Sequence, residues 1–338
     1  MTFNRNFLLF SLVFVSLTSC LITDSARTIQ LEIMKPGLII IPEDLNTVAI
    51  LNRDIYQSDT SDFIYQYNFR LVADTTINDH ELSTTCVDAL SGFLEKEAYF
   101  RKVINYRDSL NHWWTNDQTI ISPSDLFEKT KSDICIFLDF FSLNNTTIFY
   151  PLLRTEAYLR WTIAFKTDTF AYIYNQIDTL VYEPEDLPVS FNSRLKYEIK
   201  PILNNTSEYL GRYFGTKIIP SWLPVERIYY NSSNHNMLNA EKFALHNDWL
   251  KAAEIWNKET KNKNLHIAVK ASYNMALACE MEGNYDAGID WLVKSYSVMS
   301  KNNVEHRANC QRYLNILALR KREIEKLDQQ VREKSVTF

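Results

Sequence analysis

Two similar stretches in the last third of the chain, NDWLKAAEIW at 247–256 and GNYDAGIDWL at 283–292, decide the fold of that region. They start 36 residues apart. Each has a turn residue, an aromatic residue two positions later, a small residue three further on and a large apolar residue four beyond that. The small residue lets two helices approach closely, and the aromatic residue fills the gap between helical hairpins. The residues that we expect to pack the repeats are Trp249, Ala252, Trp256, Gly283, Tyr285, Gly288 and Leu292.

This spacing resembles the tetratricopeptide repeat, a helical hairpin of about 34 residues. In the second unit, Met275 and Ala276 match apolar and small positions of the first helix, while Cys279 stands where the family prefers an aromatic residue. A further helix around residues 310–317 continues as one long helix that is expected to cap the stack. The resemblance implies an all-α repeat domain over residues 234–338. The other reading is an unrelated helical bundle with the same 3.6-residue period.

Repeats of this kind usually hold peptides in the concave groove that the first helices line. The predicted partner is therefore a protein or peptide. The residues expected to face this groove are Lys270, Tyr273, Asn274, Leu277, Asn309 and Tyr313.

Upstream of residue 234, the apolar pattern changes from helical to mixed and predicts an α+β or α/β domain with a mixed sheet over residues 28–233. Alternating and continuous apolar runs predict strands, and Pro or Asp residues after polar turns predict helix starts. Pro201 is expected to kink or delay the last helix. The predicted strands are 28–34, 47–51, 103–106, 134–141, 159–165 and 170–182. Three helices are predicted: one begins near Asp79, one begins near Pro123, and the last spans 194–214.

The first twenty residues have the pattern of an exported, lipid-modified protein. Arg5 precedes the apolar run 7–17, which is too short for a transmembrane helix of about 20 apolar residues. The sequence Leu17-Thr18-Ser19-Cys20 resembles the lipobox at which bacterial lipoproteins are cleaved and acylated. An ordinary signal peptide would end in an Ala-x-Ala-like site, which this stretch lacks.

We therefore expect residues 1–19 to be a signal peptide, Cys20 to be the lipid attachment site, and residues 20–27 to form a linker. Several acyl chains give a stable membrane anchor where a single chain is marginal. Leu21 is not the Asp that retains some lipoproteins at the inner membrane, which favours the outer membrane of a Gram-negative bacterium.

Composition indicates a globular protein and a restricted set of partners. The chain has 338 residues, of which 46% are hydrophobic and 23% charged, with a net charge of −5. This negative balance argues against a nucleic-acid partner. Export makes disulfides possible, but each remaining cysteine lies in an apolar helix or strand pattern and is expected to be a small buried residue. These cysteines are Cys86, Cys135, Cys279 and Cys310.

No sequence pattern of catalysis emerges. The six glycines form no Gly-rich phosphate loop, and neither a G-x-S-x-G elbow nor an H-E-x-x-H zinc motif is present. The six histidines are expected at the surface or at helix caps. We therefore expect no enzymatic activity, no catalytic residue, no bound metal and no cofactor.

Both halves together resemble an uncharacterised family of envelope lipoproteins from Gram-negative bacteria. The matching stretches are 48–53, 219–227 and 249–256. The family has no assigned activity, so the resemblance implies an architecture and a location only.

The leading hypothesis is a membrane-anchored scaffold that binds an envelope protein through its repeats. The alternative is a lipoprotein that binds glycan or peptidoglycan through exposed aromatic rings, for which Trp113 and Trp114 are the candidates.

Overall fold

The computed structural model of the chain describes residues 26–54, 62–67, 70–76, 79–106, 123–149, 152–168, 170–182 and 199–335. These residues divide into two compact units. The helical unit joins residues 26–33 to residues 224–322, and the sheet unit joins residues 34–223 to the end of the last helix. An N-terminal α/β region with a mixed sheet and a C-terminal all-helical region of five helices are both present, as the sequence predicted.

The sheet unit is built on five strands in the order β5-β2-β6-β7-β8. Strand β2 (Thr47–Asn52) runs parallel to β5 (Lys102–Asn105) on one side and to β6 (Ile134–Phe149) on the other. Two further antiparallel strands, β7 (Leu152–Phe165) and β8 (Ala171–Tyr182), complete the sheet. A separate antiparallel hairpin, which the sequence did not predict, consists of β3 (Asp62–Tyr67) and β4 (Arg70–Thr76).

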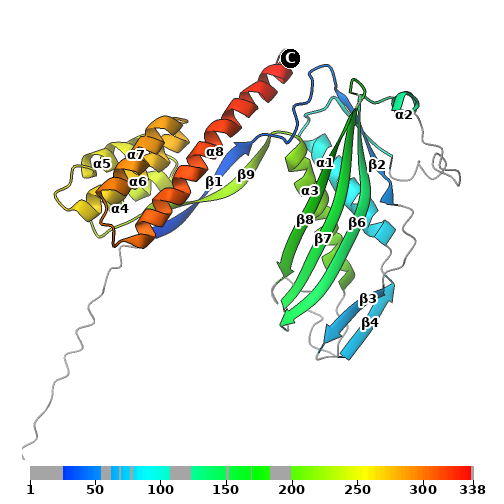
Figure 1. Cartoon of the computed structure of the whole chain (residues 1–338), viewed down its shortest axis with the longest axis horizontal. Coiled ribbons are helices and arrows are strands. Elements are labelled where there is room, and N and C mark those ends of the chain that lie inside the picture. Colours follow the sequence, from blue (N-terminus) through cyan, green and yellow to red (C-terminus); the bar gives the residue numbers. More distant parts are fainter. Residues whose placement is uncertain are drawn as a thin grey trace, which may run out of the picture. The chain divides into compact units, whose positions relative to one another are not determined.

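Two helices, α1 (Asp79–Lys96) and α3 (Ile199–Ile218), cover one face of this sheet (Figure 1). They approach closely at Gly211, where a Cβ atom would lie 2.0 Å from the carbonyl oxygen of Cys86. The other face is covered in part by α2 (Pro123–Thr130), which packs on β2 and β6.

Helix α3 extends beyond the end at residue 214 that the sequence predicted. Helix α3 continues to Ile218, and Pro201 lies in its first turn. The N–H groups of a first turn have no acceptor within the helix, so a proline there removes no hydrogen bond. The expected kink is therefore unnecessary.

The helical unit contains α4 (His235–Leu245), α5 (Trp249–Glu259), α6 (Leu265–Met281), α7 (Tyr285–Val298) and the first part of α8 (Val304–Ser335), drawn from yellow to red in Figure 1. Of the residues expected to pack the repeats, Trp249, Ala252, Trp256, Gly288 and Leu292 are buried and Tyr285 is half-buried, whereas Gly283 is exposed in the turn before α7 and packs against no helix. A Cβ atom on Gly288 would lie 3.0 Å from the Leu317 side chain and 3.3 Å from the Ala276 carbonyl oxygen, so the small residue permits a close approach.

The boundary between the units differs from the predicted division at residue 234. Strands β1 (Ala26–Lys35) and β9 (Ser221–Tyr230) pair as a two-stranded sheet, and most of both belongs to the helical unit. The reason is hydrophobic packing, because Leu31, Tyr229 and Tyr230 are buried in the core of the helices.

The C-terminal part of α8 belongs to the sheet unit. The carboxamide of Gln330 accepts from the N–H of Gly37 at 3.1 Å and donates to the carbonyl oxygens of Gly37 and Ile39 at 3.2 and 2.8 Å. Lys326 donates to the carbonyl oxygen of Leu38 at 2.6 Å. Residues 323–335 were predicted to cap the repeats, whereas these contacts place them with the sheet.

The cysteines expected to be small buried residues are free thiols, and three of the four are buried. Cys279 is half-buried. Within the described ranges, no helix combines the length and the apolar character that crossing a membrane requires.

Candidate functional site

Asn274 of α6 binds the backbone of Tyr230 in β9. The N–H of Tyr230 donates to Asn274 Oδ1 at 2.7 Å, and Asn274 Nδ2 donates to the carbonyl oxygen of Tyr230 at 2.7 Å. A carboxamide carries both an acceptor and donors, so one side chain can satisfy both backbone groups of an extended residue. Asn274 is fully buried in doing so.

The side chain of Tyr230 is surrounded by other residues of the predicted groove. Asn309 Nδ2 donates to the Tyr230 hydroxyl at 2.9 Å, and the Tyr273 ring meets the Tyr230 ring edge-on at 4.9 Å. Lys270 Nζ lies 5.6 Å from the centroid of the same ring. Burial raises the pKa of Tyr230 to about 12, so the hydroxyl is protonated at neutral pH.

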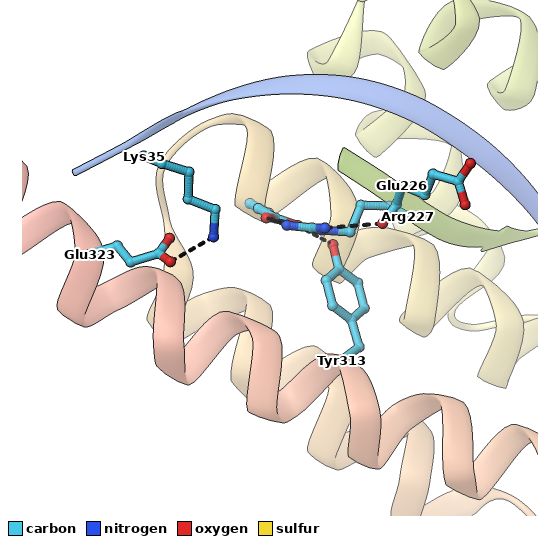
Figure 2. Close-up of polar contacts among 6 residues, drawn as sticks. Lys35, Glu226, Arg227, Tyr313 and Glu323 are labelled. Carbon is cyan, nitrogen blue, oxygen red and sulfur yellow. Dashed lines mark hydrogen bonds and ion pairs between the residues drawn. The ribbon is translucent and has the colours of Figure 1, made fainter. Parts of the chain in front are cut away.

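A buried ion pair joins β9 to α6 six residues further along that helix. Arg227 donates to both carboxylate oxygens of Glu280, with the shortest contact at 2.7 Å from Nη2. The hydroxyl of Tyr313 donates to the same carboxylate at 2.7 Å, and Figure 2 shows Arg227 and Tyr313 pointing toward one another. Burial, followed by the charge of Glu280, raises the pKa of Tyr313. Figure 2 also draws Lys35 and Glu323, an ion pair of 2.6 Å within the sheet unit.

The predicted groove residues therefore gather, but they do not form an open groove. All six are buried, and Leu277 lies in the apolar core of the helices. The expectation of a free concave surface is corrected by β9, which occupies this face of α6 through the contacts of Arg227 and Tyr230. Helical periodicity shows which residues share a face of a helix, but it does not show what covers that face. Here the face is covered by a strand whose contact residue, Tyr230, lies 44 residues from Asn274 in sequence.

Glu241 of α4 forms a second polar cluster that the sequence did not reveal. Its carboxylate accepts from the hydroxyl of Tyr229 at 2.6 Å, from the amide of Asn231, and from Arg27 of β1 at 2.8 Å. Burial and the contact with Glu241 raise the pKa of Tyr229 to about 12. These bonds fasten both strands to the first helix of the unit.

Ser295, His306 and Cys310 form a buried cluster with the residue types of a nucleophilic site. His306 Nε2 lies 2.9 Å from Ser295 Oγ and 3.3 Å from Cys310 Sγ. Burial lowers the pKa of His306 to about 4 and raises the pKa of Cys310 to about 11, so both are neutral at neutral pH. Because His306 is only 2% exposed, a substrate has no access, and the expectation of a surface or capping position is wrong for this histidine.

A cavity of about 240 Å³ lies within the helical unit next to β9. It is bordered by charged, hydroxyl and apolar side chains from β9, α6 and α8. The residues that matter for its chemistry are Glu226, Ile228, Tyr273, Asn309, Arg312 and Ile316.

The sheet unit presents an apolar stripe on β8. Ile173, Ile177 and Val181 lie on the exposed face of β8, with Asn175 and Thr179 between them on the same face, and they are 66%, 69% and 51% exposed. Among the described strands, β8 is the last of its sheet. Helix α2 packs on β2 and β6 instead, so no described helix covers this stripe.

Several predicted sites cannot be placed. Cys20, Trp113 and Trp114 lie outside the described residues. In the part of the chain that the structure describes, no three His, Cys, Asp or Glu side chains gather as a set that could hold a metal ion.

Family comparisons give two matches. The model of the family described as Domain of unknown function (DUF8603) matches residues 45–230, more than half of the chain, and the model described as Domain of unknown function (DUF6340) matches residues 238–319. Neither a curated protein nor a solved structure matches the chain. The first match includes β9, although residues 224–230 pack with the helices.

Proposed function

The chain belongs to the DUF8603 family of unknown function, and from that starting point we propose that it is a lipid-anchored scaffold of the bacterial cell envelope. It binds another protein and does not catalyse a reaction. The lipobox-like sequence before Cys20 supports the anchor and, with Leu21, an outer-membrane location. The negative net charge of −5 disfavours nucleic acid as the partner.

The repeated turns support a tetratricopeptide-like architecture. Asn247 and Gly283 both have positive φ, at 59° and 73°. The next residues, Asp248 and Asn284, cap α5 and α7 with nearly equal backbone angles, and each accepts from the N–H three positions later. Two equivalent turns at the 36-residue spacing are what a repeating helical hairpin requires.

The face of α6 that would hold a peptide already holds β9, so partner binding is assigned to the sheet unit. The buried pair of Arg227 and Glu280 makes release of β9 costly, because each charge would lose the counterion that it contacts. The repeats thus serve as a rigid platform for their own strand.

The apolar stripe of Ile173, Ile177 and Val181 carries the proposal. Exposed apolar patches on soluble domains mark interaction sites, and a long edge strand offers backbone groups for pairing with another strand. The matching partner is a protein that adds a strand along β8 and covers the stripe with apolar side chains.

A photoreactive residue at position 177 in cells tests the assignment. We expect it to crosslink one envelope protein, and Ile173→Lys in the same chain to abolish that crosslink. The matched control is a photoreactive residue at Leu250 of α5, which is 64% exposed and far from β8 in sequence. Equal capture of the same protein from both positions, or capture that survives Ile173→Lys, would contradict the proposal.

A further inference from the structure

The cavity of the helical unit is bordered by a tyrosine hydroxyl that has no hydrogen-bond partner among the described residues. Tyr273 is 2% exposed, borders the cavity, and forms no hydrogen bond with any described residue. The neighbouring hydroxyls of Tyr230 and Tyr313 are bonded to Asn309 and Glu280. Since buried polar groups are nearly always hydrogen-bonded, the Tyr273 hydroxyl is available to a molecule in the cavity.

Arg312, an exposed residue of α8, supplies a positive charge to the same cavity. It forms no ion pair with the residues that the structure describes, whereas Arg227 beside it is neutralised by Glu280. Burial raises the pKa of Tyr273, and the charge of Arg312 acts against this rise. The positive charge of the Arg312 guanidinium therefore reaches the Tyr273 hydroxyl. A hydrogen-bond donor and a positive charge close together favour the binding of an anion between them.

The shape and lining of the cavity restrict the anion. Its volume of about 240 Å³ lies below the range of about 300–1,000 Å³ that drug-sized ligands occupy. Ile228 and Ile316 give it an apolar part, and Glu226 disfavours a second negative charge. The planar fork of an arginine matches a carboxylate in geometry.

We propose that this cavity binds a small monocarboxylate with a short apolar chain. The carboxylate accepts hydrogen bonds from the Tyr273 hydroxyl and the Arg312 guanidinium, and the chain packs against Ile228 and Ile316. This site is separate from the β8 stripe, so the two assignments stand or fall independently.

Calorimetric titration of the full chain in detergent with butyrate, butyramide and succinate tests the site. We expect butyrate to bind, and its neutral isostere butyramide and the dianion succinate to bind at least tenfold more weakly. Tyr273→Phe and Arg312→Gln should each weaken butyrate binding about tenfold or more, since each removes a strong hydrogen bond to the carboxylate. Arg322→Gln is the matched control on the same helix, because Arg322 does not border the cavity, and it should bind butyrate like the wild type.

Folding defects do not obscure this result, because Tyr273→Phe removes only a hydroxyl that has no hydrogen-bond partner among the described residues. The variant should unfold at the same urea concentration as the wild type or a higher one. Absence of butyrate binding to the wild type, equal affinity for butyrate and butyramide, or unchanged affinity in both cavity variants would overturn the proposal.

Discussion

Arg227 and Glu280 face each other as a two-pronged pair, with contacts of 2.7 and 2.9 Å and both side chains nearly sealed from water. They lie 53 residues apart, one on β9 and one on α6. The pair therefore fixes the strand against the helix by charge as well as by packing.

Breaking this pair should destabilise the helical unit strongly. Glu280→Gln keeps the shape of the side chain but removes the carboxylate charge that faces the buried guanidinium of Arg227, so we expect a loss of about 3–5 kcal/mol in urea unfolding. The exposed pair of Lys321 and Asp286 is the control, and Lys321→Ala should cost less than about 1 kcal/mol. The double variant Arg227→Met with Glu280→Leu should recover much of the loss. A single variant as stable as the wild type would show that the pair is not sealed in solution.

Removing the carboxamide of Asn274 should free the backbone of Tyr230. Asn274→Ala leaves a buried N–H and a buried carbonyl without partners, at a cost of about 2–4 kcal/mol. Hydrogen exchange at the Tyr230 amide measures the effect directly and should become faster. The exposed Asn302→Ala serves as the control and should change stability by less than about 0.5 kcal/mol. Unchanged protection of the Tyr230 amide in Asn274→Ala would argue against the contact.

Stability of the helical unit should depend on pH through His306. Burial, followed by the charge of Lys270, lowers its pKa from 6.5 to about 4 in the folded chain. The unfolded chain then binds the proton more readily, so this contribution is fully present above pH 6.5 and is lost as the pH falls toward 4. The loss is on the order of 3 kcal/mol, measured as unfolding free energy against pH. His306→Gln should remove this dependence, and a slope that persists in the variant would assign it to another group.

Two glycine substitutions should have opposite effects in the sheet unit. A Cβ atom at position 37 would lie 2.2 Å from the carbonyl oxygen of Ile218, so Gly37→Ala forces the backbone apart and should lower the melting temperature. Gly92 in α1 has no atom within 4 Å of the corresponding position, so Gly92→Ala should stabilise the helix by up to about 1 kcal/mol. Thermal unfolding of the two variants gives the comparison. A Gly37→Ala protein that melts like Gly92→Ala would contradict the close contact.

Membrane attachment should depend on one atom, the sulfur of Cys20. Cys20→Ala removes the acylation site, and we expect the variant in the soluble fraction of lysed cells while the wild type sediments with membranes. Ser19→Ala is the matched control, because it keeps the small residue before the cysteine. Sedimentation of Cys20→Ala with the membranes would refute the anchor.

The parts of the fold that the sequence predicted correctly are determined by neighbouring residues. The α5 and α7 starts follow from turn residues beside Trp249 and Tyr285, and strands β2 and β6 follow from continuous apolar runs. The occupied groove was not predictable in this way. Asn274 reads as a polar residue on a helix face, and only the long-range position of Tyr230 reveals its partner.

The cavity was predicted only in part, because Tyr273, Asn309 and Tyr313 were expected to line a groove but Arg312 and the wall from β9 were not. Tyr273 and Arg312 come from different helices, and β9 supplies another wall of the cavity, so no local spacing indicates it. The Tyr- and Ile-rich sequence of residues 170–182 predicted a strand. The exposure of Ile177 could not be predicted, because it depends on the position of this strand at the end of the described sheet.

Because β1 and β9 pair across most of the chain, the helical unit cannot be completed in the order in which the protein is made. Arg27 emerges 214 residues before Glu241, its partner, and the core that receives Leu31 is made last. Closing so large a loop is a late event, and until then β1 has an unpaired edge. A truncated chain that ends before residue 224 has no β9 and no helical core for β1, so it exposes an apolar strand directly after its linker. A completed chain therefore buries Leu31 of β1 in the core of the helices, whereas an interrupted chain leaves this strand exposed.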